Sequence, residues 1–503
     1  MKRWLMHRAV VLISCSLTFF SAKTQTDSLG ALQLLERFEI PREEKIEFFK
    51  PTSSAAPVIF SREGEALFIR PMDMATGQPI KTLTIRSNDT KKIDQYGLVG
   101  DSIFVLVRSI ENHRTTGYEA VIYTLTGNEL SQAHRHSIPL PIDEAKRNIN
   151  DIFFTASKSG KHLAVVQQDL YDREKGATLF LEVTAFPNPQ PKEFTLPLPF
   201  DADDLHVLGV SIDDSGAVYI GVTTGVKLNS PFLRKYLVYA FRPETRELHE
   251  FDLSRDKKYA QDMRLKTSGN NLNIVALFSE DPFAQGSTSG YIFVQLDSSG
   301  TCISDRKELY YPPSVKQELD PQLHSDGREI TDVFIDNIHS IGGNSYAVMD
   351  RHYRDQVCTT DPRTGIITCT DQFHYEGILV ENLNNPSESK FIGRSQLDYN
   401  KLGPFVGHDS YEVGSDLYVL YNDHQRNEST DAERIMNNPD RSNLRYVRIN
   451  GNRLSSEHLV IEERNSFIYL PTVHGFVDGK TINALFSDGR NFRVGQVNTL
   501  KLR

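Results

Sequence analysis

Eight glycines along the chain each open an apolar strand pattern, and this recurrence constrains the fold more than any other feature. Glycine reaches the positive φ angles of a tight turn without steric cost. Alternating apolar residues follow each glycine, starting at the third position after it in seven of the eight cases. Such alternation predicts a strand with one buried face. The turn glycines are Gly64, Gly100, Gly160, Gly216, Gly269, Gly343, Gly414 and Gly479.

Successive turn glycines lie 36 to 74 residues apart, the range of a four-stranded sheet with loops of variable length. Hairpin-length links join the expected strands, apart from one long polar loop in each unit. This pattern is typical of an all-β β-propeller, and it fits a β-helix or a pair of β-sandwiches less well. Eight turns predict about eight blades, or seven if the first and last units share one composite blade.

Helical patterns are almost absent from this chain. Hydrophobic residues make up 39% of it, with 28 Phe and 20 Tyr, so the chain can bury a large core. The single helix candidate runs from Asp27 to Phe38, where Leu32, Leu35 and Phe38 recur at helical spacing.

The N-terminus has the layout of a secretory signal peptide. The segment MKRWLMHR is basic, AVVLISCSLTFF is an apolar core of 12 residues, and SAKTQ follows with small and polar residues. This core is too short to span a bilayer, and no later stretch approaches 18 apolar residues. The sequence therefore predicts an exported protein, periplasmic, associated with the cell envelope or extracellular. We expect a signal peptide at 1–24, a lead-in at 25–46 and a single propeller domain at 47–503.

Cys15 raises the alternative of a lipid anchor. Leu12-Ile13-Ser14-Cys15 is similar to the lipobox of bacterial lipoproteins, in which the cysteine becomes the lipidated N-terminus. However, the apolar core continues beyond Cys15 through Phe20. We therefore prefer plain cleavage near Ala22 to Gln25.

Two cysteines flank an expected hairpin. Cys358 and Cys369 enclose TTDPRTGIIT, with Pro362 to Gly365 as the loop, so they face each other across the two strands. Opposite residues in an antiparallel pair lie within disulfide range. In an exported protein this favours a bridge over two reduced thiols. Cys302 stays outside the bridge, and no Cys or His spacing typical of zinc occurs.

The charge excludes some partners. Without the first 24 residues, the formal net charge is −14, and the basic residues are dispersed. Such a surface argues against nucleic acid and against anionic membranes. We expect a protein or a small polar ligand as partner, and no cofactor, with a bound cation left open.

The last third of the chain, from Asp332 to Arg503, resembles uncharacterised exported β-propeller proteins of Bacteroidetes bacteria, often described as TolB-like repeat proteins. The segment LGPFVGHDSYEVGSDLYVLYNDHQRN carries much of the resemblance, and Tyr421 to Asn427 is its most specific part. The resemblance implies a propeller in an exported bacterial setting. It implies no catalytic residues.

A set of polar residues recurs at one offset from the turn glycines, nine positions after each. An equal offset predicts that these side chains lie on one face, together with the long loops. A ring of carboxylates there could bind a cation, a basic peptide or a polar small molecule. The alternative is that each aspartate caps the turn that ends its strand. The predicted binding face comprises Asp73, Asp169, Asp423 and Asp488, with His352 at the same offset and Asp350 two residues before it.

No motif names a reaction. Neighbouring units would bring Asp350, His352, Asp423 and His424 near one another, which is the arrangement a hydrolase needs. His134 and His136 share a strand face but lack a third metal ligand. We favour an exported, non-enzymatic propeller that binds a protein or other ligand through its loop-rich face. The alternatives are a carbohydrate-active or other hydrolytic propeller using carboxylates at its axial mouth, and a structural component of an envelope assembly.

Overall fold

The computed structural model places most of the chain beyond residue 30. It describes residues 31–502 except 42, 53–55, 112–113, 127–128, 139–151, 169–175, 202–203, 226–234, 256, 270, 284–285, 298–300, 304–305, 320–327, 361–362, 365–366, 386–388, 399–404, 428–434, 451–452, 455–457 and 460–466. Everything below refers to these residues.

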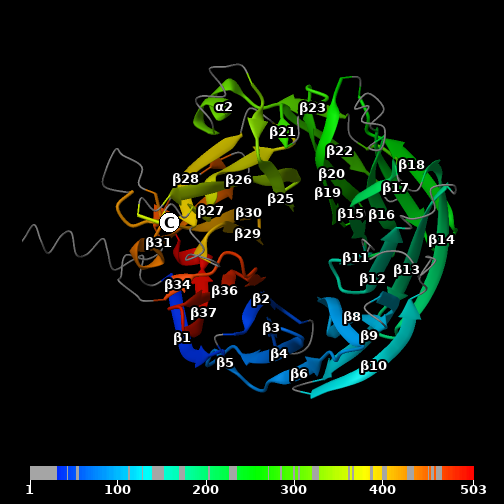
Figure 1. Cartoon of the computed structure of the whole chain (residues 1–503), viewed down its shortest axis with the longest axis horizontal. Helices are drawn as coiled ribbons and strands as arrows, with labels where there is room; N and C mark the ends of the chain where they lie inside the picture. Colours follow the sequence, from blue (N-terminus) through cyan, green and yellow to red (C-terminus); the bar gives the residue numbers. More distant parts are fainter. Residues whose placement is uncertain are drawn as a thin grey trace, which may run out of the picture.

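Eight antiparallel sheets of four or five strands follow one another around a ring (Figure 1). Each sheet is one blade, and its first strand lies nearest the centre. The chain is therefore a β-propeller, which confirms the predicted fold class, and the described sheets give it eight blades.

The first four blades each take their strands from one continuous segment. Blade 1 contains β2 (Lys45–Lys50), β3 (Val58–Glu63), β4 (Ala66–Asp73) and β6 (Leu83–Arg86), with β5 (Gln78–Pro79) beside β4. Blade 2 contains β7 (Lys91–Val99), β8 (Ser102–Glu111), β9 (Arg114–Thr126) and β10 (Glu129–Ile138). Blade 3 contains β11 (Ile152–Ala156), β12 (His162–Gln168), β13 (Gly176–Ala185) and β14 (Gln190–Asp201). Blade 4 contains β15 (His206–Ile212), β16 (Val218–Thr224), β17 (Lys235–Arg242) and β18 (Glu247–Asp252).

The next three blades repeat the arrangement. Blade 5 contains β19 (Tyr259–Ser268), β20 (Asn271–Ser279), β22 (Gly290–Leu296) and β23 (Lys307–Tyr310). Blade 6 contains β25 (Val333–Ile341), β26 (Asn344–Thr360), β27 (Ile367–Asn382) and β28 (Lys390–Asp398). Blade 7 contains β29 (His408–Val413), β30 (Asp416–His424), β31 (Ser442–Asn450), β32 (Arg453–Leu454) and β33 (His458–Leu459). The connections hold β21 (Ser287–Thr288) paired with β24 (Ile330–Thr331), α2 (Pro313–Leu319) and η5 (Pro439–Arg441).

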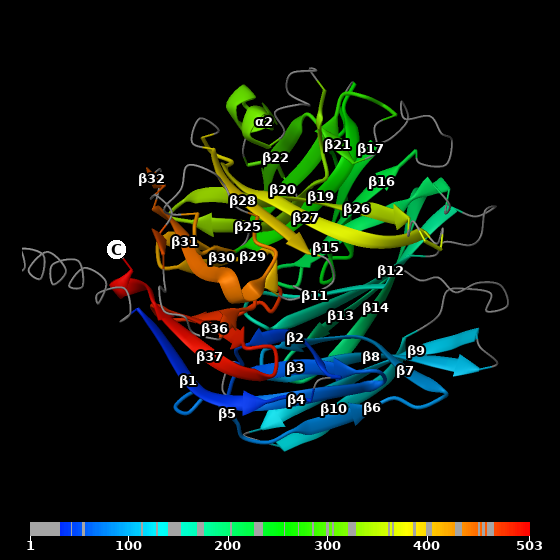
Figure 2. The ribbon, with the colours of Figure 1, turned by 60° about the vertical axis from the view of Figure 1, so that its left-hand side comes forward.

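Blade 8 joins the two ends of the described chain. It contains β35 (Phe476–Asp478), β36 (Thr481–Ser487) and β37 (Asn491–Asn498), with β34 (Ile468–Tyr469) beside β36 and η6 (Thr499–Lys501) after β37. Its outermost strand is β1 (Leu32–Glu39), which lies against β37 (Figure 2). A composite blade therefore exists, as the seven-blade alternative required. The count is eight because the first unit also forms a sheet of its own.

The helix expected from Asp27 to Phe38 is wrong where the structure describes it, since this segment forms β1. The register shifts between Leu34 and Arg37, so β1 has one more residue than β37 at this β-bulge. The bulge lets both Leu35 and Phe38 face the core, three positions apart. One turn of helix would give the same spacing, which explains the misleading pattern.

All eight turn glycines adopt the positive φ that the sequence pattern demanded, between 52° and 88°. Seven of them join the first strand of a blade to the second. Gly64 joins the second and third strands of blade 1 instead, because residues 51–57 already link β2 to β3. In the first unit the turn glycine thus lies one strand later in its blade than in the other units.

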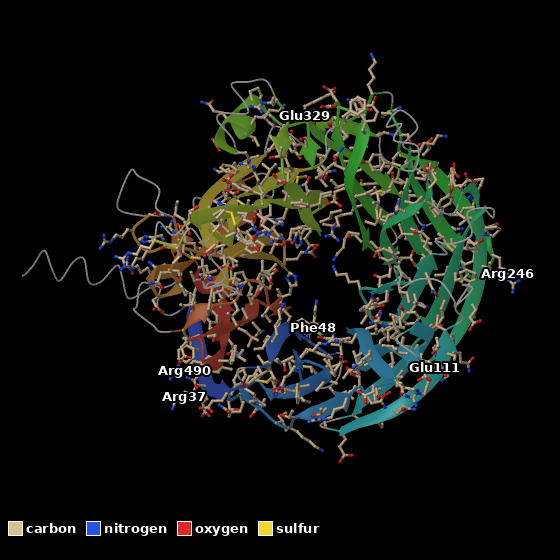
Figure 3. The ribbon with its side chains drawn as sticks, viewed as in Figure 1. Arg37, Phe48, Glu111, Arg246, Glu329 and Arg490 are labelled. Carbon is tan, nitrogen blue, oxygen red and sulfur yellow. A yellow bond between two sulfur atoms is a disulfide. The ribbon has the colours of Figure 1, made fainter. Side chains whose placement is uncertain are left out.

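The core lies between the blades. Second strands are covered by a neighbouring blade on each side, and every residue of β16 and of β30 is buried. First strands line the centre and last strands lie at the rim. Figure 3 shows Phe48 beside the centre, whereas Arg37, Glu111, Arg246 and Arg490 lie at the periphery.

Candidate functional site

Two of the predicted site aspartates are turn caps. Asp73 accepts hydrogen bonds from the Ala75 amide and the Thr76 hydroxyl, at 2.9 Å each. Asp488 accepts hydrogen bonds from the backbone amides of Arg490 and Asn491 at 2.8 and 2.7 Å. These local bonds lower the pKa of Asp73, and they outweigh burial in lowering that of Asp488. Both follow the alternative interpretation of the aspartate pattern.

The prediction that the four aspartates share one face is wrong for Asp73. Asp73 ends the third strand of its blade, whereas Asp423 and Asp488 lie at the end of a second strand. Neighbouring strands are antiparallel, so Asp73 lies at the opposite face. The displaced Gly64 turn causes this difference. Asp169 lies outside the described residues.

Asp423 is a buried member of an ion pair. Its Oδ2 lies 3.0 Å from Arg445 Nε on the next strand, and both side chains are less than a tenth exposed. Asn427 Nδ2 donates to Oδ1 at 2.7 Å. The carboxylate is therefore already neutralised inside blade 7.

Asp350, His352 and Asp423 have different partners. The His352 ring stacks between Phe334 and Tyr375, with centroid distances of 4.6 and 5.6 Å. Asp350 instead approaches a histidine of blade 7, described below. Each of these three side chains thus has a partner outside the predicted group.

The structure instead gathers polar side chains on the strands that line the centre of the ring. His408, the first residue of β29, lies between two carboxylates of blade 6. Its Nε2 is 3.3 Å from Asp336 Oδ2, and its Nδ1 is 3.4 Å from Asp350 Oδ2. Asp336 occupies a β-bulge of β25, which turns its side chain toward blade 7. Burial opposes ionisation of Asp336, but the hydrogen bond and charge of His408 outweigh it and lower its pKa.

A second imidazole–carboxylate pair connects blades 7 and 8. His474 Nδ1 lies 3.0 Å from Asp409 Oδ1, and the Gly475 amide donates to Asp409 Oδ2 at 3.3 Å. The hydrogen bond and charge of Asp409 raise the pKa of His474. The His474 carbonyl accepts from the Phe49 amide at 3.2 Å, which brings β2 of blade 1 to the same cluster.

A third group lies toward the turn-bearing end. Glu412 Oε1 lies 3.1 Å from His339 Nδ1, and its Oε2 lies 3.4 Å from Lys158 Nζ. Burial opposes ionisation of Glu412, but His339 and Lys158 outweigh it and lower its pKa to about 2. Lys158 belongs to the Gly160 turn of blade 3, four blades from Glu412. This contact therefore crosses the centre of the ring.

Two lysines of the centre lack such partners. Lys50 ends β2 and Lys266 lies in β19, on blades that are again four apart. Neither has an ion-pair or hydrogen-bond partner in the part of the chain described here. Both side chains are exposed, yet desolvation by the surrounding protein lowers the pKa of each, and the charge of Lys50 lowers that of Lys266 further. The charges of Asp409 and Glu412 act in the opposite direction, on Lys50 and Lys266 respectively. These interactions show that both lysines lie near the carboxylates Asp409 and Glu412.

The axial cluster, as we name these residues, was missed by sequence reasoning. It comprises Lys50, Lys158, Lys266, Asp336, His339, Asp350, His408, Asp409, Glu412 and His474. Only Asp350 was among the predicted site residues. The available signal was the presence of charged residues in the first strand of successive units, where an apolar face was expected.

The cysteine predictions are confirmed. Cys358 and Cys369 pair directly across β26 and β27 and form a disulfide. Cys302 is exposed and takes no part in a disulfide. From Arg354 to Thr360 every residue of β26 is exposed, so the disulfide braces a hairpin that extends beyond the ring.

Metal ligation finds no support among the described residues, in which no group of three or more His, Cys, Asp or Glu side chains could hold an ion. His136 instead pairs with Glu182 at 2.7 Å, and the His134 ring lies 5.1 Å from the His136 ring. Within the same residues, no helix has the length and apolar character needed to cross a bilayer.

No protein-family model and no curated protein sequence matches the chain. Solved propellers are similar to it at low identity. The polysaccharide lyase Uly1 has 10% identity and a TM-score of 0.41, covering 93% of this chain and 100% of that one. The WD40 domain of SCAP from fission yeast has 10% identity and a TM-score of 0.38, covering 94% and 99%. The β-propeller domain of the Trilobed protease from Pyrococcus furiosus has 8% identity and a TM-score of 0.36, covering 81% and 94%.

Proposed function

We propose that this chain is an exported, non-enzymatic β-propeller that binds an anionic ligand at the centre of its ring. The observation that carries the proposal is the pair of partnerless lysines, Lys50 and Lys266. The other acidic and basic groups of the axial cluster contact an opposite charge or an imidazole. The two lysines make no such contact, and only the more distant charges of Asp409 and Glu412 act on them.

The energetics favour an anion between them. Each ammonium group has lost part of its hydration, and the two repel each other. A carboxylate, sulfate or phosphate group would accept hydrogen bonds from both and replace the missing water. The ligand class is therefore a small molecule or chain end that carries such a group.

The entry side follows from the Lys158–Glu412 contact. That pair crosses the centre near the glycine turns. The second strands end at the opposite face, where Asp423 and Asp488 also lie. A ligand would enter through this loop-bearing face, as the sequence prediction proposed.

Export rests on other observations. The N-terminal segment has the layout of a signal peptide, and the last third of the chain resembles exported Bacteroidetes propellers. The Cys358–Cys369 disulfide is consistent with an oxidising compartment.

Isothermal titration of the mature protein with sulfate, phosphate and glucuronate, at constant ionic strength, tests the proposal. We expect at least one anion to bind to the wild type, and the Lys50→Met/Lys266→Met variant to bind it at least tenfold more weakly. Lys81→Met, which changes an exposed lysine between β5 and β6, serves as the matched control. Equal binding by the double variant, or no binding of any anion by the wild type, would refute the axial site.

A second candidate is a hydrolytic propeller, favoured by Asp336 beside His408. The Asp336 side chain is 35% exposed and could reach a substrate, whereas the His408 side chain is only 2% exposed. Such an enzyme would use Asp336 as its general base, since its lowered pKa keeps the carboxylate ionised. Release of reducing ends from acidic polysaccharides by the wild type, and its loss in Asp336→Asn, would favour this candidate over simple binding.

A further inference from the structure

We propose a second ligand site between blades 2 and 3, for a small planar molecule with an amide edge, meaning an N–H donor beside a C=O acceptor. The site is independent of the axial cluster. It is a cavity of 260 Å³ between the outer strand of blade 2 and one face of blade 3. The residues that line it are Ile138, Val165, Gln167, Phe180, Leu181, Glu182, Glu193, Phe194 and Thr195.

Gln167 carries the inference. Its side chain is 1% exposed, yet among the described residues neither Nε2 nor Oε1 has a hydrogen-bond partner. The oxygen and nitrogen of a buried amide side chain normally both form hydrogen bonds, because leaving either atom without one costs free energy. Gln167 lies in the cavity wall, so a donor and an acceptor are both presented to whatever occupies it.

The strand register explains why these side chains meet. Gln167 of β12 pairs with Phe180 of β13, which pairs with Thr195 of β14. Residues directly opposite one another in a sheet point to the same face. Val165, Glu182 and Glu193 form the neighbouring row in the same way. Both rows face the outer strand of blade 2, where Ile138 lies.

The second buried polar group of the cavity is already engaged. Glu182 Oε2 lies 2.7 Å from His136 Nε2, and the Thr184 hydroxyl donates to its Oε1 at 3.2 Å. Glu182 is therefore held in place and does not satisfy Gln167. The carboxamide of Gln167 is therefore the group of the described cavity wall that a ligand would have to satisfy, with one donor and one acceptor.

The ligand chemistry follows from these partners. An amide edge matches a carboxamide with two antiparallel hydrogen bonds, one in each direction. The ring of Phe180, which lies in the same row as Gln167, offers its surface to a planar body. Two glutamates and no Lys or Arg line the cavity, so an anion is disfavoured. Aromatic carboxamides and nucleobases have the required edge, shape and charge.

Ligand-observed NMR and titration calorimetry with benzamide and uracil test the site, with benzoate as the charged analogue. We expect the mature wild-type protein to bind benzamide or uracil, and to bind benzoate at least tenfold more weakly than benzamide. Gln167→Leu keeps the side-chain size and removes both polar atoms, so it should lose at least tenfold in affinity. Gln132→Leu makes the same change at an exposed position of β10 and should bind as the wild type does.

A second variant keeps the test informative if Gln167→Leu does not fold. Thr195 is an exposed residue of the outer strand β14 and lies at the edge of the cavity. Thr195→Phe should block the cavity and abolish binding, whereas Thr195→Ser should preserve it. Wild-type protein that binds neither probe, or folded Gln167→Leu that binds them unchanged, would overturn the proposal.

Discussion

Lys158 Nζ lies 3.4 Å from Glu412 Oε2, although the two residues belong to blades on opposite sides of the ring. Contacts between adjacent blades are expected in any propeller. A contact across the axis instead joins parts of the chain that the blade-to-blade packing leaves apart.

Glu412 should make the protein acid-sensitive. Its pKa falls from 4.5 to about 2 on folding, so the stabilisation is complete above pH 4.5 and is lost as the pH falls toward 2. We expect wild-type protein to lose about 2 kcal/mol over this range through Glu412, after allowing for its partial exposure. Glu412→Gln should lack this component. Urea denaturation at pH 5 and pH 3 measures the difference, and Glu244→Gln, at an exposed glutamate, is the control. Parallel pH profiles for wild type and Glu412→Gln would contradict this role.

The two axial lysines should destabilise the ligand-free protein. A lysine whose pKa is lowered on folding disfavours the folded state while it is charged, and this penalty fades as pH rises toward its ordinary value of 10.5. Lys50→Met/Lys266→Met should therefore have a higher melting temperature than wild type at pH 7. This difference in melting temperature should shrink by pH 10. Anions that bind at the axial cluster should raise the melting temperature of the wild type but not that of the variant. A lower melting temperature at pH 7 would show that the lysines are structural.

Asp423 and Asp73 should respond differently to the same substitution. Asp423→Asn leaves Arg445 buried without its counter-charge, which should cost about 3 kcal/mol of unfolding free energy. Asp73→Asn should leave stability unchanged, because asparagine caps the same exposed turn. Chemical denaturation of both variants provides the comparison. Equal losses would mean that the aspartates have equivalent roles after all.

The fold could be predicted because its signal is local. A glycine that must adopt positive φ and an alternating strand after it are both visible within about ten residues. The sequence did not show in this way which two strands the turn of the first unit joins. Gly64 looks like the other turn glycines, and only the pairing of β3 with β4 shows that it joins different strands. The misplacement of Asp73 followed from that one ambiguity.

The axial cluster could not be predicted because its signal is not local. Lys50 and Lys266 look like ordinary surface lysines in the sequence, and 216 residues separate them. Their proximity depends on ring closure, which sets each first strand against the axis. Asp336 adds a second obstacle, since a β-bulge changes the face to which it points.

The disulfide should act locally. It closes a short loop at the end of an exposed hairpin, so it should stabilise the folded hairpin by about 3 kcal/mol. Thiol labelling of denatured, non-reduced mature protein should modify Cys302 and spare Cys358 and Cys369. Reduction should expose both cysteines while the melting temperature of the ring changes little. Labelling of Cys358 before reduction would contradict the bridge.

Export should depend on the apolar N-terminal core. Leu12→Arg with Leu17→Arg places two charges in that core, each costing about 2.5 to 3.5 kcal/mol on insertion. We expect the double variant to stay in the cytoplasm, as cell fractionation would show. Mass spectrometry of the exported wild type separates lipidated Cys15 from a start near residues 23 to 26. Unchanged export of the double variant would remove the signal-peptide interpretation.

The pairing of β1 with β37 sets an order of events during biosynthesis. β1 is made before every other described strand, and β37, which it must join, is made after them all. Seven sheets can form as the chain emerges, but the ring stays open until β37 has been made. The earliest-made strand must remain unpaired throughout that time, with its apolar side chains available to other partners. A chain truncated before Asn491 would lack the strand to which β1 pairs, so loss of β37 should be more damaging than loss of a loop between two strands.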